Sequence, residues 1–297
     1  MLQVLLILAF AAVFHGILGR TRSVLSGRKG PGILQPVYNL ALLFRKGEVI
    51  CADSGIIFRI APTVSFSAVL IALLTAPFGK LGSAISFNGD FILFAYLLAL
   101  SRFIMILGAL DTASSFEGMG ASREALYGML AEPAFFVLAG TFSMLTGYNS
   151  FAEIFDFFDL ANLNAVIPGL LAAFAFFLML LVETGRLPVD DPRTHLELTM
   201  IHEVMILDYS GFDLALIHIA TCIKAAIYSA LTVLCVLPGN LHPAIYMPLF
   251  IVLIILVPVI TGFFESFRAR NRLQRNPSYI LTMTVMAIIS FITAAII

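Results

Sequence analysis

The sequence predicts an all-α polytopic membrane protein of about eight transmembrane helices, with its N- and C-termini on the outer (periplasmic) side. Of its 297 residues, 60% are hydrophobic and only 12% are charged, whereas soluble globular domains are nearer half apolar and a quarter charged. Apolar stretches approaching about 20 residues recur along the chain, each long enough to cross a hydrocarbon core of about 30 Å. Basic residues gather in alternate loops. A single transmembrane domain over residues 1–297 is therefore expected.

The apolar runs place the predicted helices, in chain order, at residues 1–19, 57–79, 90–111, 125–147, 165–186, 213–237, 244–264 and 278–297. The first run differs from a signal peptide, because nothing basic precedes it and Arg20 and Arg22 follow it. It is expected to remain as a membrane helix. Residues 36–46 carry apolar side chains at helical spacing before a basic end. This pattern is typical of a short helix in the membrane interface, or of a docking surface for a soluble subunit.

The lysines and arginines predict the orientation of the chain. Fourteen of the 17 lie in or beside the loops after the first, third, fifth and seventh predicted helices. Lys80 is alone in the other loops, and Arg102 and Lys224 fall inside helices. Because cytoplasmic loops carry the excess of basic residues, the odd-numbered loops are predicted to be cytoplasmic. The longest of these span about 20–56 and 187–212.

Acidic residues at or near membrane depth are the candidate functional groups. Ionisable side chains in a membrane span cost several kcal/mol each and face the bundle interior or a wet cavity. In this sequence they are Asp111, Glu117, Glu124, Glu132, Glu183, Asp190, Asp191, Glu197, Glu203, Asp208 and Asp213. Such a series, mostly near one face of the membrane, predicts a proton relay or an ion path.

Some of these residues also have simpler interpretations. Glu183 and Arg186 are three residues apart and can form an ion pair at a helix end. Asp190 and Asp191 lie among prolines that break the helix, so both can be loop residues in water. The sequence leaves these alternatives open.

The segment that follows contains a possible capping box. Thr194 and Glu197 have the spacing that opens a helix, here over residues 195–207. In that helix Glu197 and Asp208 share a face. A zinc-binding His-Glu-x-x-His motif would need a histidine where Ile206 stands, so no metal site is predicted.

Lys224 lies about ten residues into the sixth predicted helix and shares a stripe with Thr221 and Tyr228. It either pairs with a carboxylate such as Glu132 or Asp208, or takes part in proton transfer. The three cysteines form no Cys-x-x-Cys pair, so the chain itself is not expected to bind an iron–sulfur cluster, a haem or another cofactor.

Three motifs together resemble a known family. They are residues 27–32 (Gly-Arg-Lys-Gly-Pro-Gly) with residues 43–46 (Leu-Phe-Arg-Lys), residues 183–192 (Glu-Thr-Gly-Arg-Leu-Pro-Val-Asp-Asp-Pro), and residues 208–211 (Asp-Tyr-Ser-Gly). In this order and these loops, they are similar to subunit 1 of respiratory complex I. They are also similar to its counterpart in group 4 membrane-bound hydrogenases such as formate hydrogenlyase. The resemblance extends over nearly the whole chain.

The resemblance implies a subunit of the inner (cytoplasmic) membrane without a catalytic centre of its own. A soluble redox arm would dock on its cytoplasmic loops, with a hydrogenase-like large subunit, iron–sulfur subunits and antiporter-like membrane subunits as partners and no nucleic acid. An iron–sulfur cluster in a partner would lie nearby. The expected arm interface comprises Arg28, Lys29, Arg45, Lys46, Arg193 and His195.

The same resemblance assigns an ion path to the acidic residues together with Arg186 and Lys224. Glu183, Arg186, Asp190 and Glu197 match charged positions of the family, and Asp208 stands where a glutamate is usual. The implied function is to couple electron transfer to proton or sodium translocation.

Departures from the complex I pattern favour the hydrogenase branch. Complex I has Glu-Ser-Glu where this chain has His195-Leu196-Glu197, and the stretch from Glu197 to Asp208 is nearly one helical turn longer. Lys224 and the compact loop at residues 30–33 also fit the hydrogenase branch. Three alternatives stay open: a quinone-site subunit of complex I, a passive anchor for the soluble arm, and a stand-alone secondary ion transporter. The absence of an internal repeat in the sequence disfavours the transporter.

Overall fold

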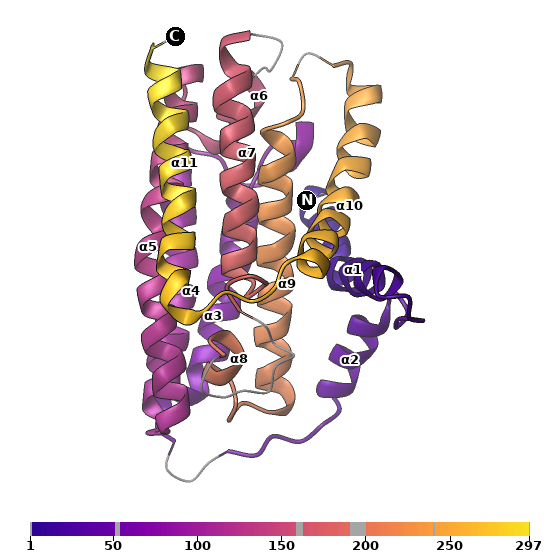
Figure 1. Ribbon diagram of the computed structural model, residues 1–297, viewed down its shortest axis with the longest axis vertical. Coiled ribbons are helices and arrows are strands. Elements are labelled where there is room, and N and C mark those ends of the chain that lie inside the picture. The colour runs from indigo at the N-terminus through magenta and orange to yellow at the C-terminus, as the bar shows by residue number, and fades with distance from the viewer. Residues whose placement is uncertain (1, 51–53, 159–162, 191–199, 240, 297) are drawn as a thin grey trace.

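The computed structural model describes residues 2–50, 54–158, 163–190, 200–239 and 241–296 (Figure 1). Within these ranges the regular secondary structure is helical. Eight of the helices are long and apolar enough to cross a membrane, which confirms the predicted fold class. They are α1 (Leu2–Leu25), α3 (Ile56–Thr75), α4 (Asp90–Asp111), α5 (Ser115–Thr146), α7 (Leu163–Glu183), α9 (Gly211–Leu234), α10 (Pro243–Phe267) and α11 (Asn276–Ile296).

Three shorter α-helices accompany them: α2 (Gln35–Leu43), α6 (Phe151–Phe157) and α8 (His202–Met205). Helix α2 has no buried residue, and it agrees with the short helix expected near residues 36–46. The helix predicted over 195–207 is reduced, in the described part of that segment, to the single turn of α8. Residues 191–199 lie outside the described residues.

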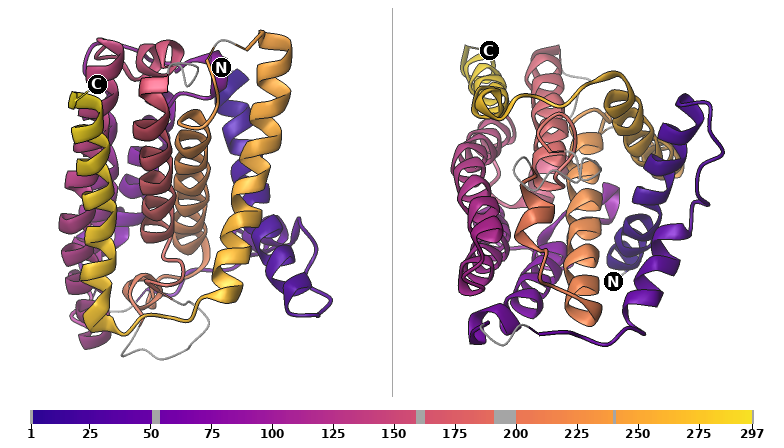
Figure 2. Two further views of the ribbon diagram at one scale, coloured as in Figure 1. Left: turned by 45° about the horizontal axis from the view of Figure 1, so that its top comes forward. Right: turned by 60° about the horizontal axis from the view of Figure 1, so that its bottom comes forward.

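Six of the long helices form a closed ring. Each of α3, α4, α5, α11, α7 and α9 packs against the next, and α9 returns to α3. The α1–α10 pair packs on the outside of this ring, against α9 (Figure 2). Helix α8 lies beneath the lower end of α7 (Figure 1) and contacts α5 and α4. The centre of the ring is therefore enclosed on all sides by helices, which is where ionisable residues of a membrane protein are expected.

The two termini lie at the same end of the bundle (Figure 2). Gln3 at the start of α1 donates a hydrogen bond to the Ala76 carbonyl, which directly follows α3. The loops rich in basic residues meet at the opposite end. There the Asn271 N–H donates to the Pro188 carbonyl at 3.0 Å, and Arg270 pairs with Asp190. We call this the basic end.

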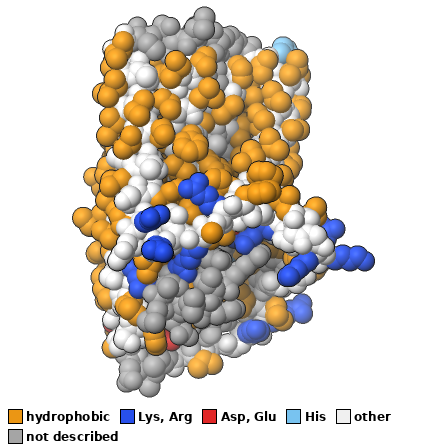
Figure 3. All heavy atoms as spheres, in the orientation of Figure 1, with side chains coloured by type: hydrophobic (Ala, Val, Ile, Leu, Met, Phe, Trp, Pro, Cys, Tyr) orange, Lys and Arg blue, Asp and Glu red, His pale blue; other side chains and the backbone are white. Residues whose placement is uncertain are grey.

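The surface agrees with a membrane-embedded bundle. On the face seen in Figure 3, apolar side chains cover the upper part, and lysines and arginines gather in the lower part. Exposed apolar side chains are favourable in lipid, whereas charged groups belong at the interface or beyond it. The chain is therefore a multi-pass membrane protein with one strongly basic end.

Three carboxylates, of which Asp90 and Glu117 are buried and Asp111 is half-buried, hold helix ends and loops together. Asp90 accepts from the Phe151 N–H at 2.5 Å, at the start of α6. Asp111 accepts from the Phe58 N–H at 3.0 Å, in the first turn of α3. Such bonds satisfy N–H groups that have no partner within a helix. Glu117 accepts from the Asp208 N–H at 2.9 Å. Helix α5 begins ten residues before its predicted start, because the charged side chains of its first turns find partners in the segment around α8.

The motif Tyr209-Ser210-Gly211 joins α9 to α3 and to the first long loop. The ring of Tyr209 stacks on Phe58 with centroids 4.1 Å apart, and its hydroxyl donates to the Phe58 carbonyl at 3.1 Å. Burial raises the pKa of Tyr209, so the hydroxyl stays protonated as a donor. Ser210 Oγ accepts from the Val49 N–H at 2.9 Å. Gly211 has φ +54° and lies against the Gly47 carbonyl.

Gly211→Ala is expected to destabilise this junction by about 1–3 kcal/mol, the usual range for overpacking. A Cβ at Gly211 would lie 2.8 Å from the Gly47 oxygen, and the left-handed backbone is also unfavourable for alanine. The expected readout is faster proteolytic cleavage in the loop at residues 44–50. Gly32→Ala is the matched control, since no atom lies within 4 Å of a Cβ there. Equal cleavage rates in the two variants would contradict the prediction.

An arginine and three glutamates inside the helix ring

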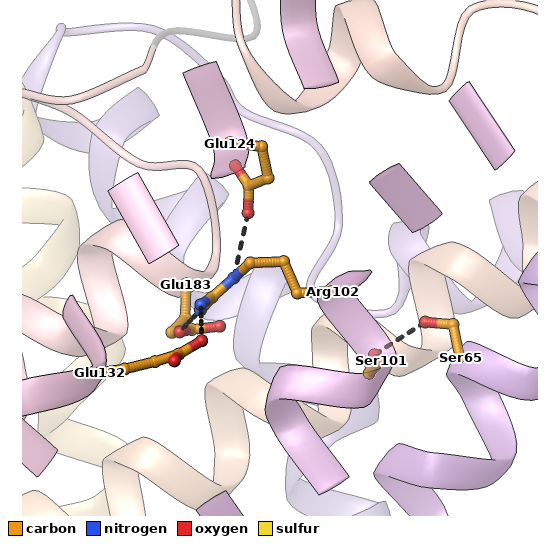
Figure 4. Close-up of polar contacts among 6 residues, drawn as sticks. All are labelled: Ser65, Ser101, Arg102, Glu124, Glu132 and Glu183. Carbon is orange, nitrogen blue, oxygen red and sulfur yellow. Dashed lines mark hydrogen bonds and ion pairs between the residues drawn. The ribbon is translucent and has the colours of Figure 1, made fainter. Parts of the chain in front are cut away.

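The candidate functional site is built around Arg102 of α4, whose side chain is 7% exposed. Its Nε lies 3.5 Å from Glu124 Oε1, and its Nη1 lies 3.1 Å from Glu132 Oε1. Its Nη2 forms an ion pair with Glu183. Glu124 and Glu132 belong to α5 and Glu183 ends α7, so the four residues join three walls of the ring. Figure 4 shows the guanidinium directed toward the three carboxylates. We call these four residues the Arg102 cluster.

The positive charges near the cluster do not balance its carboxylates. Lys224 of α9 lines the same cavity as Arg102, Glu124 and Glu183, and no ion pair or hydrogen bond of Lys224 is found among the described residues. Two cations thus face three carboxylates. A buried ion pair is stable only when its charges are compensated, so a set with unequal charges favours either a bound proton or a further cation.

Two small cavities touch the cluster. The inner cavity, about 20 Å³, is lined by the Arg102, Glu183 and Lys224 side chains and by the hydrogen-bonded hydroxyls of Ser65 and Ser101, 2.7 Å apart (Figure 4). The second, the α4–α5 cavity, about 40 Å³, is lined by Arg102, Glu132, Glu183, Tyr228 and nearby apolar side chains. Each has charged groups in a partly apolar lining and room for at least one water molecule. Water there can bridge carboxylates that do not touch.

A larger lateral cavity, about 470 Å³, lies between α1, α2, α9 and the segment after α7. Its polar lining comprises His15, Asn39, Lys46, Thr184, Arg186, His202, Glu203, His218 and Thr221, and leucines of α2 supply much of the rest. The lateral cavity and the inner cavity share His202 and Thr221, and the inner cavity and the α4–α5 cavity share Arg102 and Glu183. Adjacent cavities with charged or polar groups in their linings therefore follow one another from the basic end to the Arg102 cluster.

A second buried set of charges lies at the basic end. Glu265 of α10 is 1% exposed; its carboxylate lies 2.5 Å from Arg22 Nη1 and 4.0 Å from Arg186 Nε. Glu183 and Arg186 do not pair with each other: Glu183 pairs with Arg102, and Arg186 turns to Glu265. The proposed Glu183–Arg186 pair was wrong, because Gly185 adopts φ +58° and turns the chain between them.

Asp190 fixes the segment around α8. Its Oδ2 accepts from the backbone N–H groups of Ile201 at 3.1 Å and His202 at 3.0 Å, and its Oδ1 lies 3.4 Å from Arg270 Nη2. The carboxylate is buried. Burial raises the pKa of Asp190, and these N–H groups and Arg270 limit the rise. Asp190 is not a loop residue in water, so the simpler interpretation of this residue is wrong.

The structure brings only some of the predicted site residues together. Glu124, Glu132, Glu183 and Lys224 meet at the cluster, whereas Arg186 and Glu203 line the lateral cavity. Asp111 holds the start of α3, and Asp208 is exposed before α9. Of the predicted arm interface, Arg28, Lys29, Arg45 and Lys46 are exposed at the basic end. Asp191, Arg193, His195 and Glu197 lie outside the described residues.

Sequence reasoning overlooked four residues of these sites: Arg102, Glu265, His15 and His218. Arg102 and His218 lie within apolar runs, and an ionisable residue at such depth is itself a signal of function. Glu265 was hidden because the predicted helix ended at residue 264, whereas α10 continues to Phe267. These signals are present in the sequence, but their partners are not.

The fold and the site together define a class of protein: a multi-pass membrane protein in which adjacent cavities lie between a basic end and an arginine–carboxylate cluster inside the helix ring. The profile of the family described as NADH dehydrogenase matches residues 1–297. The chain belongs to this family, that of complex I subunit 1, which confirms the resemblance drawn from its motifs.

Similar proteins support this family assignment. Hydrogenase-4 component C of Escherichia coli (strain K12) is 33% identical over 239 residues, covering 80% of this chain and 74% of the relative. Formate hydrogenlyase subunit 4 of the same organism is 30% identical over 284 residues, covering 93% and 92%. A chain in the structure of the membrane-bound sulfane sulfur reductase, an archaeal respiratory membrane complex, has a TM-score of 0.78 at 22% identity, with 99% and 98% of the chains covered. This likeness shows the shared fold.

Proposed function

We propose that this chain is the core membrane subunit of a complex I-like, ion-translocating assembly of the group 4 hydrogenase type. In this proposal it anchors a soluble redox arm at the basic end and couples electron transfer to the translocation of protons or sodium ions across the inner membrane. One observation supports the proposal: the Arg102 cluster lies inside the helix ring, and adjacent cavities with charged groups in their linings lie between it and the basic end.

The coupling would begin in the segment at residues 187–212. Redox chemistry in the soluble partner changes the field or the contacts there. Asp190 holds the backbone of His202, and His202 lines both the lateral and the inner cavity. A displacement of this turn therefore reaches the inner cavity directly.

Glu183 is the central group of the proposed path. It pairs with Arg102 and lines the inner cavity together with Lys224. Interactions between unit charges about 4 Å apart amount to several kcal/mol at a partly buried site. A shift of Arg102 or Lys224 relative to Glu183 therefore changes which carboxylates of the cluster hold a proton or a cation.

Docking of the soluble arm would use the exposed cations of the basic end, which include Arg28, Lys29, Arg45 and Lys46. The expected partners are a hydrogenase-like large subunit and iron–sulfur subunits, with antiporter-like subunits in the membrane. The iron–sulfur cluster nearest this chain would belong to a partner. Arg193 and His195 belong to the same proposed interface.

Glu183→Gln in the assembled complex tests the proposal. Ion uptake by proteoliposomes driven by the redox reaction is expected to fall at least tenfold, because the neutral amide cannot exchange a proton or hold a cation, while electron transfer by the soluble arm continues. Glu153→Gln, at an exposed position of α6, is the matched control. Undiminished ion uptake in Glu183→Gln would overturn the proposed path, and loss of the arm itself would support a passive anchor.

A second candidate function is that of a quinone-site subunit, and the lateral cavity favours it. Its volume, about 470 Å³, falls within the range of small-molecule sites, and its mixed polar and apolar lining fits an amphipathic ring. Quinone-dependent turnover by the purified complex, inhibited by quinone-site inhibitors, would select this function. Turnover independent of quinone would reject it.

A further inference from the structure

Glu132 differs from the rest of the Arg102 cluster in its exposure. Its side chain is 47% exposed, compared with 17% for Glu124 and 7% for Glu183. It reaches Arg102 from the outer face of the ring, through the α4–α5 cavity. One carboxylate of an otherwise buried cluster therefore lies at the surface of this chain.

The position of Glu132 along α5 places it at the depth of the hydrocarbon core. It lies fourteen residues before Thr146, the last residue of α5, a rise of about 21 Å at 1.5 Å per residue. The helix continues for seventeen residues on its other side, to Ser115. Lipid headgroups at either interface are too far away to solvate this carboxylate.

The surface around Glu132 is strongly apolar. Tyr96 of α4 is 64% exposed and Met129 of α5 is 73% exposed, and Tyr96 packs beside Phe136 with ring centroids 6.2 Å apart. Leu100 and Phe103 continue the exposed apolar surface along α4. We call this surface the α4–α5 face. Acyl chains offer a carboxylate neither a hydrogen bond nor a counter-charge, so a half-exposed carboxylate within this face is costly in lipid.

The charge of the cluster indicates what covers this face. Arg102 and Lys224 provide two positive charges against three carboxylates, and the excess is negative. We propose that the α4–α5 face binds a transmembrane helix of a partner membrane subunit, which presents a lysine or arginine to Glu132 at the same depth. The partner's cation completes the Arg102 cluster from outside. This inference deepens the proposed function, because Glu132 belongs to the same cluster.

A second copy of this chain does not fit the same face. A symmetric contact through the α4–α5 face would bring two Glu132 carboxylates toward each other, and like charges at low dielectric repel strongly. The large side chains exposed on this face are apolar, so they supply no cation for a symmetric partner.

Site-directed photocrosslinking in membranes that contain the assembled complex tests the inference. p-Benzoylphenylalanine is placed at Tyr96 and at Met129, and at Val252 of α10 as a control that is similarly exposed, at 62%. Tyr96 and Met129 are expected to crosslink to one transmembrane segment that contains a lysine or arginine, as identified by mass spectrometry of the adduct. Three results would overturn the inference: yields no higher than at Val252, adducts with a second copy, or a crosslinked segment without a basic residue.

Charge reversal gives an independent readout. Glu132→Lys is expected to lower the recovery of the crosslinked subunit at least fivefold, and replacing that subunit's cation with glutamate is expected to restore it. Glu153→Lys is the control. Full recovery with Glu132→Lys would contradict the inference.

These results are separate from those of the proposed function, which is read from ion uptake in Glu183→Gln. If crosslinking succeeds and ion uptake is undiminished in Glu183→Gln, the proposed interface at the α4–α5 face is supported and the proposed ion path is rejected. If Glu183→Gln uncouples the complex and no crosslink forms, only the proposed interface is rejected.

Discussion

Replacing Arg102 with methionine is expected to destabilise the protein by about 3–5 kcal/mol, the cost of removing one partner from a buried ion pair. Methionine keeps much of the volume, so cavity formation contributes little. The loss arises because Glu124, Glu132 and Glu183 would share a small space without their common counter-charge. The measurements are the amount of chain assembled in the membrane and the thermal unfolding midpoint of the purified complex.

Two further variants make this prediction specific. Arg59→Met removes an exposed cation near the start of α3, and it is expected to cost no more than about 1 kcal/mol. The double variant Arg102→Met with Glu183→Gln is expected to recover part of the loss, because the two residues interact directly. Unfolding midpoints of Arg102→Met and Arg59→Met that are equal would show that the cluster does not stabilise the bundle.

The second large effect is expected from Gly128→Ala, at about 1–3 kcal/mol. A Cβ at Gly128 would lie 2.5 Å from Arg102 Nη1, 2.9 Å from its Cδ and 3.1 Å from its Cζ. Nη1 is the atom that contacts Glu132. The substitution therefore pushes the guanidinium away from its present position, and both stability and redox-driven ion uptake are expected to fall.

Gly140→Ala is the matched control in the same helix. No atom lies within 4 Å of a Cβ at Gly140, and alanine favours a helix over glycine by about 1 kcal/mol. This variant is therefore expected to be neutral or slightly stabilising. A loss in Gly140→Ala as large as that in Gly128→Ala would assign the effect to the backbone of α5 and not to Arg102.

The sequence was sufficient to predict the membrane helices and which of the connecting loops lie at the same end of the bundle. Hydrocarbon thickness sets the length of an apolar run, and this signal is local, so α4 matches its predicted range and most other long helices lie close to theirs. The exceptions are α5, which begins ten residues early, and α1, which ends six residues late. The clustering of basic residues in alternate loops likewise predicted that these loops share one end of the bundle. Family motifs at residues 183–192 and 208–211 added the class of complex.

The sequence could not show which charges meet. Asp111 and Glu183 are both carboxylates at the end of an apolar run, yet Asp111 holds the start of α3 and Glu183 binds Arg102. The difference arises from the ring, which brings α4 beside α5 and directs α7 toward both. Gly128 is another case, since only the packing of α4 on α5 shows that its missing side chain makes room for a guanidinium.

By itself, the sequence determined that this protein spans the membrane about eight times, that its basic loops gather together, and that carboxylates lie at membrane depth. These properties follow from the solvation of single residues and short segments. Only the tertiary structure decided that Arg102 joins three of the carboxylates, that Arg186 pairs with Glu265, and that Glu132 reaches the outer face. Ion pairing acts over a few ångströms between residues far apart in the chain, so it depends on how the helices pack.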